Sequence, residues 1–269
     1  MLEQTTRYDL MNLKGQTAYV TGGDSDIGAA ICDAFGQCGA NVAIAARNEV
    51  KMQKVQARLK EFGANALTTH ADVTDERSVQ ESVNQVLAKY QTIEILVNAA
   101  GVTGPVETPL HEIRQEDWDY VIDSNVKGTF LVCKAIVPIM IKQKRGKIVN
   151  IAGTSGLRGY INRAAYSTSK WAVRGLTRTL ALEVGKYNVN VNAICPGVVE
   201  GKRMSDIIAR KAKAWNCTEQ DVYDKYVAEM ALGRFTLAED VARAALFLVS
   251  DGGRQITGHD IVVDGGWDV

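Results

Sequence analysis

The stretch TAYVTGGDSDIG, residues 17–28, decides the fold. It begins with a short apolar run, Thr17–Val20, that is typical of a buried strand, and it continues through two adjacent glycines into a helical pattern from Ile27. A glycine-rich turn between strand and helix lets the backbone approach a phosphate, and the helix N-terminus offers free N–H groups. We therefore expect a nucleotide phosphate site here, although a tight turn without a ligand has the same local pattern.

Strand-like and helical patterns alternate on either side of this stretch. The further strands are predicted at Val42–Ala46, Ala66–Thr69, Ile93–Val97, Lys147–Ile151, Asn190–Ile194 and Asp260–Val263. The helices are predicted at Ile27–Cys38, Val50–Phe62, Asp75–Tyr90, Trp118–Lys142, Ala164–Lys186 and Glu239–Ser250. Continuous apolar strands alternating with helices indicate a parallel sheet covered on both faces. The predicted fold is α/β and doubly wound: a single Rossmann-like domain over 13–269, with a mainly parallel seven-stranded sheet and an N-terminal extension over 1–12.

Composition excludes several classes of protein. Lys plus Arg and Asp plus Glu both number 31, so no global field favours nucleic acid or an anionic membrane. The five cysteines form no CxxC pair, which indicates a reducing compartment such as the cytoplasm and gives no reason to expect a metal site. The first residues lack the apolar core of a secretory signal, and no stretch approaches the roughly 20 apolar residues of a membrane span.

An extra segment follows the sixth predicted strand. Residues 198–235 have the pattern helix, turn, helix, and Thr218 with Asp221 resembles a helix-start box. An insertion beyond the strand ends is a candidate substrate lid.

Tyr166 and Lys170, in the segment YSTSK, carry the clearest chemical signal. Residues four apart share one face of a helix. An ammonium about 4 Å from a phenol favours the phenolate by roughly 4 kcal/mol, enough to lower the tyrosine pKa by up to about 3. Such a tyrosine can exchange a proton with a carbonyl oxygen near neutral pH. The alternative is a core tyrosine beside a surface lysine.

After about residue 12, the chain resembles a short-chain dehydrogenase/reductase over its whole length. Thr21, Gly22 and Gly28 match that family's TGxxxGxG turn, and 98–101 (NAAG) is similar to its NNAG segment. The resemblance implies an oxidoreductase that transfers a hydride between a nicotinamide cofactor and a ketone or secondary alcohol, with Tyr166 as general acid and base.

The resemblance also assigns roles to individual residues. Asn125 would hold a water that joins Lys170 to solvent, Lys170 would hold the nicotinamide ribose, and Asp72 and Val73 would contact the adenine. The expected catalytic residues are Asn125, Ser155, Tyr166 and Lys170. The expected cofactor-binding residues are Gly22, Ser25, Asp26, Ile27, Gly28, Arg47, Asp72, Val73, Asn98, Ala99, Gly101, Tyr166, Lys170, Pro196, Gly197 and Val199. The segment 256–266 resembles the family's ending, which usually lies at a subunit interface, so a homodimer or homotetramer is expected.

Two positions depart from the family pattern. Asp26 replaces the middle glycine of the turn, where its carboxylate either caps the helix or competes with cofactor phosphates for N–H groups. The catalytic serine is normally thirteen residues before the tyrosine, and Gly153 stands there. Ser155 or Thr154 could supply the hydroxyl if the loop shifts, whereas Ser155 could equally be a simple turn residue.

The second strand ends in Ala46-Arg47. NAD-preferring relatives place an acid at the position of Ala46 to bind the ribose 2′-hydroxyl. Its absence, followed by an arginine suited to a 2′-phosphate, favours NADP(H), with NAD(H) still possible. The alternative is that Arg47 is simply solvated.

The substrate pocket is expected between Thr103–His111, Gly153–Arg163 and Val198–Phe235. Basic residues in these segments (Arg158, Arg163, Lys202 and Arg203) suggest an acidic substrate, although for Arg203–Lys213 a solvated basic helix face is at least as good an interpretation. A sugar or polyol, a cyclic ketone and a 3-oxoacyl thioester all remain open. Asp26 and Gly153 also raise a second hypothesis, a nucleotide-binding sensor or scaffold with weakened catalysis.

Overall fold

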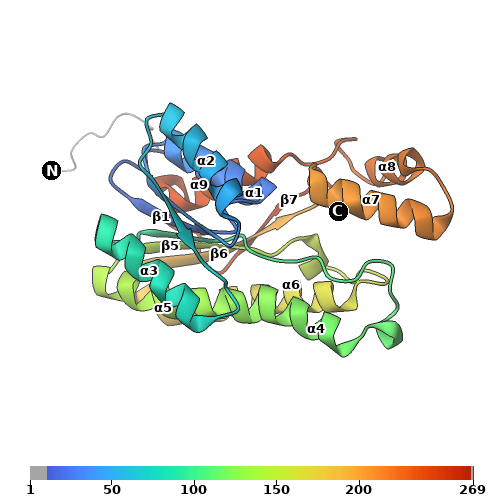
Figure 1. Ribbon diagram of the computed structural model, residues 1–269, viewed down its shortest axis with the longest axis horizontal. Helices are drawn as coiled ribbons and strands as arrows, with labels where there is room; N and C mark the ends of the chain where they lie inside the picture. Colours follow the sequence, from blue (N-terminus) through green and yellow to red (C-terminus); the bar gives the residue numbers. More distant parts are fainter. Residues whose placement is uncertain (1–10, 268) are drawn as a thin grey trace.

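Seven parallel strands form one sheet in the computed structural model, which describes residues 11–267 and 269 (Figure 1). The strands are β1 (Thr17–Thr21), β2 (Asn41–Ala46), β3 (Ala66–His70), β4 (Ile95–Asn98), β5 (Gly146–Ile151), β6 (Val189–Pro196) and β7 (Asp260–Val263). Their order is β3-β2-β1-β4-β5-β6-β7. The chain therefore first adds β2 and β3 on one side of β1 and then adds β4 to β7 on its other side. The predicted fold class is confirmed, and each strand end lies within two residues of its prediction. The predicted extension over 1–12 falls almost entirely outside the described residues.

Helices cover both faces of the sheet. They are α1 (Asp26–Gln37), α2 (Glu49–Glu61), α3 (Glu76–Tyr90), α4 (Gln115–Ile122), α5 (Gly128–Gln143), α6 (Ala164–Val184), α7 (Lys202–Trp215), α8 (Glu219–Ala228) and α9 (Ala238–Val249). Helices α1, α2 and α9 lie on one face, and α3, α5 and α6 on the other (Figure 1). Strands β1, β4 and β6 are buried along their whole length, which agrees with their largely apolar sequences. The polar Asn190 and Asn192 of β6 are buried as well, and their side chains donate hydrogen bonds to the Ile256 carbonyl.

The helix predicted at Trp118–Lys142 is longer and less regular than expected. It runs over 115–143 and includes a π-helical turn at Asp123–Lys127, where the Gly128 N–H bonds to the Asp123 carbonyl. Such turns are frequent at functional sites. By length and composition alone this segment could cross a bilayer, contrary to the expectation that no stretch is apolar over a sufficient length. Half of its most apolar window is buried inside the molecule, however, as in a core helix of a globular domain.

Helices α7 and α8 project beyond the carboxyl end of β6 (Figure 1). The Thr218 hydroxyl accepts the Asp221 N–H at 3.1 Å and the Asp221 carboxylate accepts the Thr218 N–H at 2.9 Å, so the predicted helix-start box is confirmed. The two helices enclose a small apolar cluster that includes Ile208, Phe235 and Trp267. This hairpin therefore has its own core beside the sheet.

The close packing of the first turn leads to a stability prediction. A Cβ at Gly28 would collide with the backbone carbonyl of Gly22, whereas one at Gly175, exposed within α6, would meet nothing. Gly28→Ala should destabilise the protein by about 1–3 kcal/mol, and Gly175→Ala should stabilise it by about 0.5–1 kcal/mol. Urea unfolding of both variants measures the difference, and equal effects would contradict this account.

Candidate active site

A cleft of about 1100 Å³ opens at the carboxyl ends of the strands, against α7. It brings together eleven of the residues predicted from sequence. They are Ser25, Asp26, Ile27, Ala99, Gly101, Ser155, Tyr166, Lys170, Pro196, Gly197 and Val199. All three predicted substrate segments contribute to its wall. The cleft therefore joins the glycine-rich turn to Tyr166 in one continuous space.

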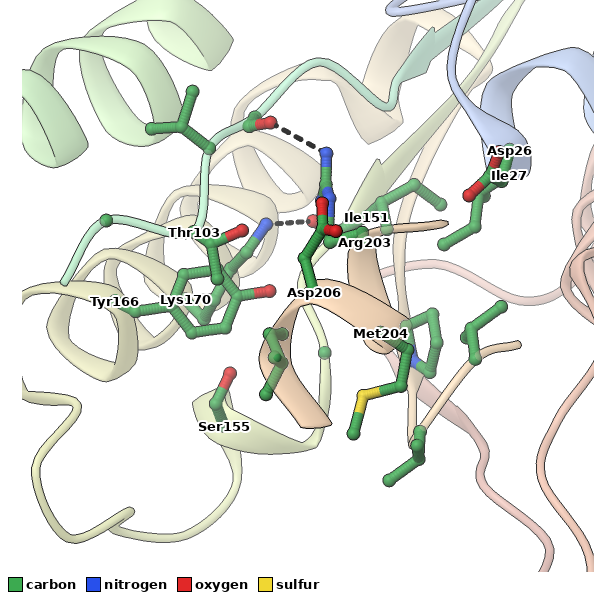
Figure 2. A pocket seen from close by; sticks show the side chains of 18 of the residues that line it. Asp26, Ile27, Thr103, Ile151, Ser155, Tyr166, Lys170, Arg203, Met204 and Asp206 are labelled. Atoms are coloured by element: carbon green, nitrogen blue, oxygen red, sulfur yellow. Dashed lines mark hydrogen bonds between the residues drawn. The ribbon is translucent and has the colours of Figure 1, made fainter. Parts of the chain in front are cut away.

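Tyr166 and Lys170 lie on one face of α6, as their spacing predicted (Figure 2). The Lys170 ammonium lies 5.5 Å from the centre of the Tyr166 ring and donates a hydrogen bond to the Ile151 carbonyl at 2.9 Å. Lys170 is buried, whereas Tyr166 is partly exposed to the cleft. The backbone at the end of β5 thus fixes the lysine beside the tyrosine.

The charges around Tyr166 favour its phenolate. Burial raises the pKa of this tyrosine, but the positive charges of Lys170, Arg203 and Arg163 and a hydrogen bond from Ser155 together bring the pKa below its ordinary value. Burial likewise lowers the pKa of Lys170, partly offset by Tyr166. A tyrosine in this environment can give and take a proton closer to neutral pH than a free phenol.

The expected serine position, Gly153, has φ +114°, a conformation that strains any residue with a side chain. The chain then makes a short 3₁₀ turn over Thr154–Gly156. This turn places the Ser155 hydroxyl 3.6 Å from where a Cβ at Gly153 would stand, and the hydroxyl points toward the Tyr166 phenol (Figure 2). The Thr154 hydroxyl instead bonds to the Tyr160 hydroxyl at 3.2 Å. Of the two candidates, Ser155 has the hydroxyl near Tyr166.

Asn125 lies in the π-helical turn and its side chain is fully engaged. The amide donates to the Val102 carbonyl at 3.0 Å and the Ser169 hydroxyl at 2.9 Å, and its oxygen accepts the Val102 N–H at 2.8 Å. This agrees with a structural hydrogen-bonding role. A water-holding role for Asn125 stays a prediction.

The turn after β1 shows that Ser25, and not Asp26, caps α1. The Ser25 hydroxyl accepts the Gly28 N–H at 3.2 Å. The alternative that Asp26 is the cap is therefore wrong. Its carboxylate instead lies against Gly201, the residue before α7, where a Cβ would collide with it. Since a Cβ at Gly22 would also lie 2.8 Å from the Ala100 backbone, the loop keeps the close-packed shape of a phosphate cradle.

Four further predicted cofactor residues, Arg47, Asp72, Val73 and Asn98, are not among the residues that line the cleft. Arg47 is largely exposed and pairs loosely with Asp72 at 3.8 Å, which brings the expected ribose and adenine residues together. Burial raises the Asp72 pKa, but hydrogen bonds from Thr74 and the charge of Arg47 hold it below its ordinary value. Val73 packs against Gly128. Asn98 donates to Asn150 at 2.8 Å inside the sheet, so its side chain is not free to face the cleft.

Sequence reasoning missed Trp267 as a lining residue, whereas Tyr160 and Tyr226 lie within the predicted substrate segments. Tyr160, Tyr226 and Trp267 form an aromatic wall, with Trp267 5.6 and 5.7 Å from the two tyrosine rings. Gly265 and Gly266, both with positive φ, turn the chain so that Trp267 returns to the cleft. This glycine pair before an aromatic residue was the signal available in the sequence.

Contacts from α7 also cross the cleft, and sequence reasoning did not anticipate them. Arg203 donates to the Gly101 carbonyl at 3.0 Å (Figure 2). Farther along the helix, the Trp215 indole donates to Glu107 at 2.9 Å and Lys211 lies 3.3 Å from the same carboxylate. Helix α7 is therefore held against the 101–107 segment at both of its ends.

The chain is similar to known proteins in both sequence and fold. A family model described as enoyl-(acyl carrier protein) reductase matches residues 22–268. The 3-oxoacyl-[acyl-carrier-protein] reductase FabG of Thermotoga maritima is 36% identical over 95% of this chain and 99% of its own. A crystal structure of NAD⁺-bound xylitol dehydrogenase superposes with a TM-score of 0.91 at 31% identity, covering 94% of this chain and 99% of that one. A variant of actinorhodin polyketide ketoreductase with NADPH gives 0.90 at 31% identity, covering 94% and 97%.

The environment of Tyr166 leads to a titration prediction. The ultraviolet absorbance of tyrosinate should show one ionisation below that of ordinary tyrosines, and Tyr166→Phe should remove it. Lys170→Met should move this step to higher pH, because a positive charge that stabilises the phenolate is lost. The exposed Tyr120 serves as the control, since Tyr120→Phe should leave the low step in place. A low step that survives Tyr166→Phe would contradict the assignment.

Proposed function

The chain belongs to the short-chain dehydrogenase/reductase family and transfers a hydride between a nicotinamide cofactor and a ketone or secondary alcohol; we propose that Tyr166 is its general acid and base. The observation that supports this role is the cluster of three cations that lowers the Tyr166 pKa at the wall of the cleft. Tyr166 donates its proton to the carbonyl oxygen during reduction, and in the reverse direction the phenolate removes the proton of the alcohol.

We assign supporting roles to three side chains. Lys170 stabilises the phenolate, Ser155 donates a hydrogen bond to the reacting oxygen, and Asn125 holds the Val102 backbone and Ser169 in place. The position of the Ser155 hydroxyl near the Tyr166 phenol supports its role. The nicotinamide ring, when bound, supplies or accepts the hydride.

The residues after β1 and β2 fit a dinucleotide, and we propose NADP(H) as the preferred one. The N-terminus of α1 and the small residues at Gly22 and Gly28 would accommodate the pyrophosphate. No carboxylate stands at Ala46 to repel a 2′-phosphate, and Arg47 is exposed beside it.

We also propose that the protein works in the cytoplasm as a homodimer or homotetramer. Large apolar side chains are exposed on two helices, Trp171 and Leu182 on α6 and Phe247 on α9, as expected for surfaces that pair with another copy. The five cysteines are free thiols, which is consistent with a reducing compartment.

Hydride transfer is tested by following reduced-cofactor absorbance with a broad panel of ketones and secondary alcohols. Tyr166→Phe should lower kcat by about 10²–10⁴-fold while cofactor affinity is retained. Ser155→Ala should lower kcat by about 10²–10³-fold, because a donor to the reacting oxygen is lost. Thr154→Val is the matched control, since its hydroxyl bonds to Tyr160. Cofactor binding without turnover of any member of the panel would favour the sensor or scaffold hypothesis instead.

Cofactor preference is tested by calorimetric titration of NADP⁺ and NAD⁺. Arg47→Ala should raise the NADP⁺ Kd about 10-fold, since a charge-assisted contact to the phosphate is lost at a solvent-exposed site. The NAD⁺ Kd of the same variant should stay the same. Ala46→Asp should favour NAD⁺ by restoring an acid for the ribose hydroxyl. An unaltered NADP⁺ Kd in Arg47→Ala would refute the phosphate assignment.

A further inference from the structure

Arg163 is a buried cation at the wall of the cleft. It precedes α6 by one residue, is 8% exposed, and its guanidinium carbon lies 4.8 Å from the centre of the Tyr166 ring. Its Nε atom is buried and makes no hydrogen bond. In the described part of the chain, no carboxylate forms an ion pair with it. An unpaired buried charge is costly, which calls for a compensating group.

Comparable cations in the structure do have hydrogen-bond acceptors. Arg174 is also 8% exposed, but it makes two hydrogen bonds to Asp260, at 2.7 and 3.0 Å. The two other cations beside Tyr166 each donate to a backbone carbonyl: Lys170 to Ile151, and Arg203 to Gly101. Of these four cations, only Arg163 has no hydrogen-bond acceptor among the residues that the structure describes.

The groups that face Arg163 do not neutralise it. Burial lowers its pKa, and the acidic groups near enough to raise it are the phenols of Tyr166, Tyr226 and Tyr160 and the carboxylate of Glu107. Glu107 is already held by Lys211 at 3.3 Å and by the Trp215 indole at 2.9 Å. The surroundings of Arg163 therefore retain an excess of positive charge.

The position of Arg163 identifies the ligand that would neutralise it. Its neighbours Glu107, Tyr160 and Tyr226 come one each from the three segments expected to form the substrate pocket. Arg163 lies three residues before Tyr166, at the N-cap of α6, and Lys170 lies four residues after Tyr166 within the helix. The lysine is on the side expected to hold the cofactor, so the arginine faces the substrate.

We propose that Arg163 binds a carboxylate of the substrate, so that the enzyme interconverts a short oxo acid and its hydroxy acid. This rests on the proposed role of Tyr166 in hydride transfer. A planar guanidinium matches the two oxygens of a carboxylate. Because the same guanidinium packs on the ring of Tyr166, the carboxylate is attached close to the reacting carbonyl carbon.

Matched pairs of substrates test the carboxylate directly. Pyruvate, acetoacetate and levulinate are each compared with their own methyl ester, and kcat/KM is measured for each. At least one acid should exceed its ester about 10-fold or more, mainly through a lower KM. Esters turned over as well as or better than all three acids would overturn the proposal and leave the hydride-transfer function intact. Preference for a keto phosphate such as dihydroxyacetone phosphate would also overturn it.

Variants separate carboxylate binding from tuning of Tyr166. Arg163→Gln should lower the acid-to-ester ratio about 10- to 100-fold, and Arg163→Lys should restore only part of it. Arg210→Gln is the matched control, because Arg210 lines the cleft but is exposed, and its loss changes the net charge equally. An equal loss of acid and ester turnover in Arg163→Gln would show that Arg163 acts only on the Tyr166 pKa and would overturn the proposal.

A binding measurement does not depend on turnover. Malonate and its neutral analogue malonamide are titrated calorimetrically into the protein saturated with NADP⁺. Malonate should bind the wild-type protein, and Arg163→Gln should weaken its binding about 10-fold or more, whereas malonamide should bind neither. Malonate binding that is equal in the two proteins, or absent from both, would refute the carboxylate site. If malonate binds through Arg163 and no carbonyl is reduced, the proposed function fails and the carboxylate site stands.

Discussion

The parallel pairing of the strands is the constraint on which the rest of the structure depends. Because every strand runs in the same direction, all carboxyl ends reach one edge of the sheet. The reversal of strand order between β1 and β4 then leaves a crevice at that edge, where α/β proteins generally bind their ligands. Thr21 pairs with Asn98 in this register, so the glycine-rich turn and the segment after β4 lie in contact. The cleft is a consequence of topology before any side chain is considered.

Within the cleft, positive charge is distributed unevenly. Lys170 and Arg203 are held by backbone carbonyls, so their charges are fixed near the Tyr166 phenol. Arg163 adds a third charge against the Tyr166 ring, and no described residue accepts a hydrogen bond from its Nε atom. Such preorganised charges stabilise an anion without reorganising during the reaction. The same arrangement can serve two anions, the phenolate and, as we propose, a substrate carboxylate.

Much of this could be predicted from the sequence because it is encoded locally. The strands are short segments rich in apolar residues, the box at Thr218 and Asp221 depends on residues three apart, and Tyr166 and Lys170 need only helical spacing. Features that depend on packing between distant segments could not be predicted. The π-helical turn, the return of Trp267 to the cleft and the attachment of α7 to Glu107 all arise from contacts across the fold. The position of the Asp26 carboxylate could not be predicted either, because it lies against Gly201, which is far away in sequence.

The turn after β5 brings a hydroxyl close to a position that lacks one. The backbone at Gly153 has a torsion angle that a serine would adopt only under strain, and the 3₁₀ turn that follows places the Ser155 hydroxyl 3.6 Å from where a Cβ at Gly153 would stand. Catalysis depends on where an oxygen atom lies in space, whereas a sequence motif specifies only how many residues separate two positions. At such loops, equivalent hydroxyl groups are therefore better identified by their position in the structure than by their column in a sequence alignment.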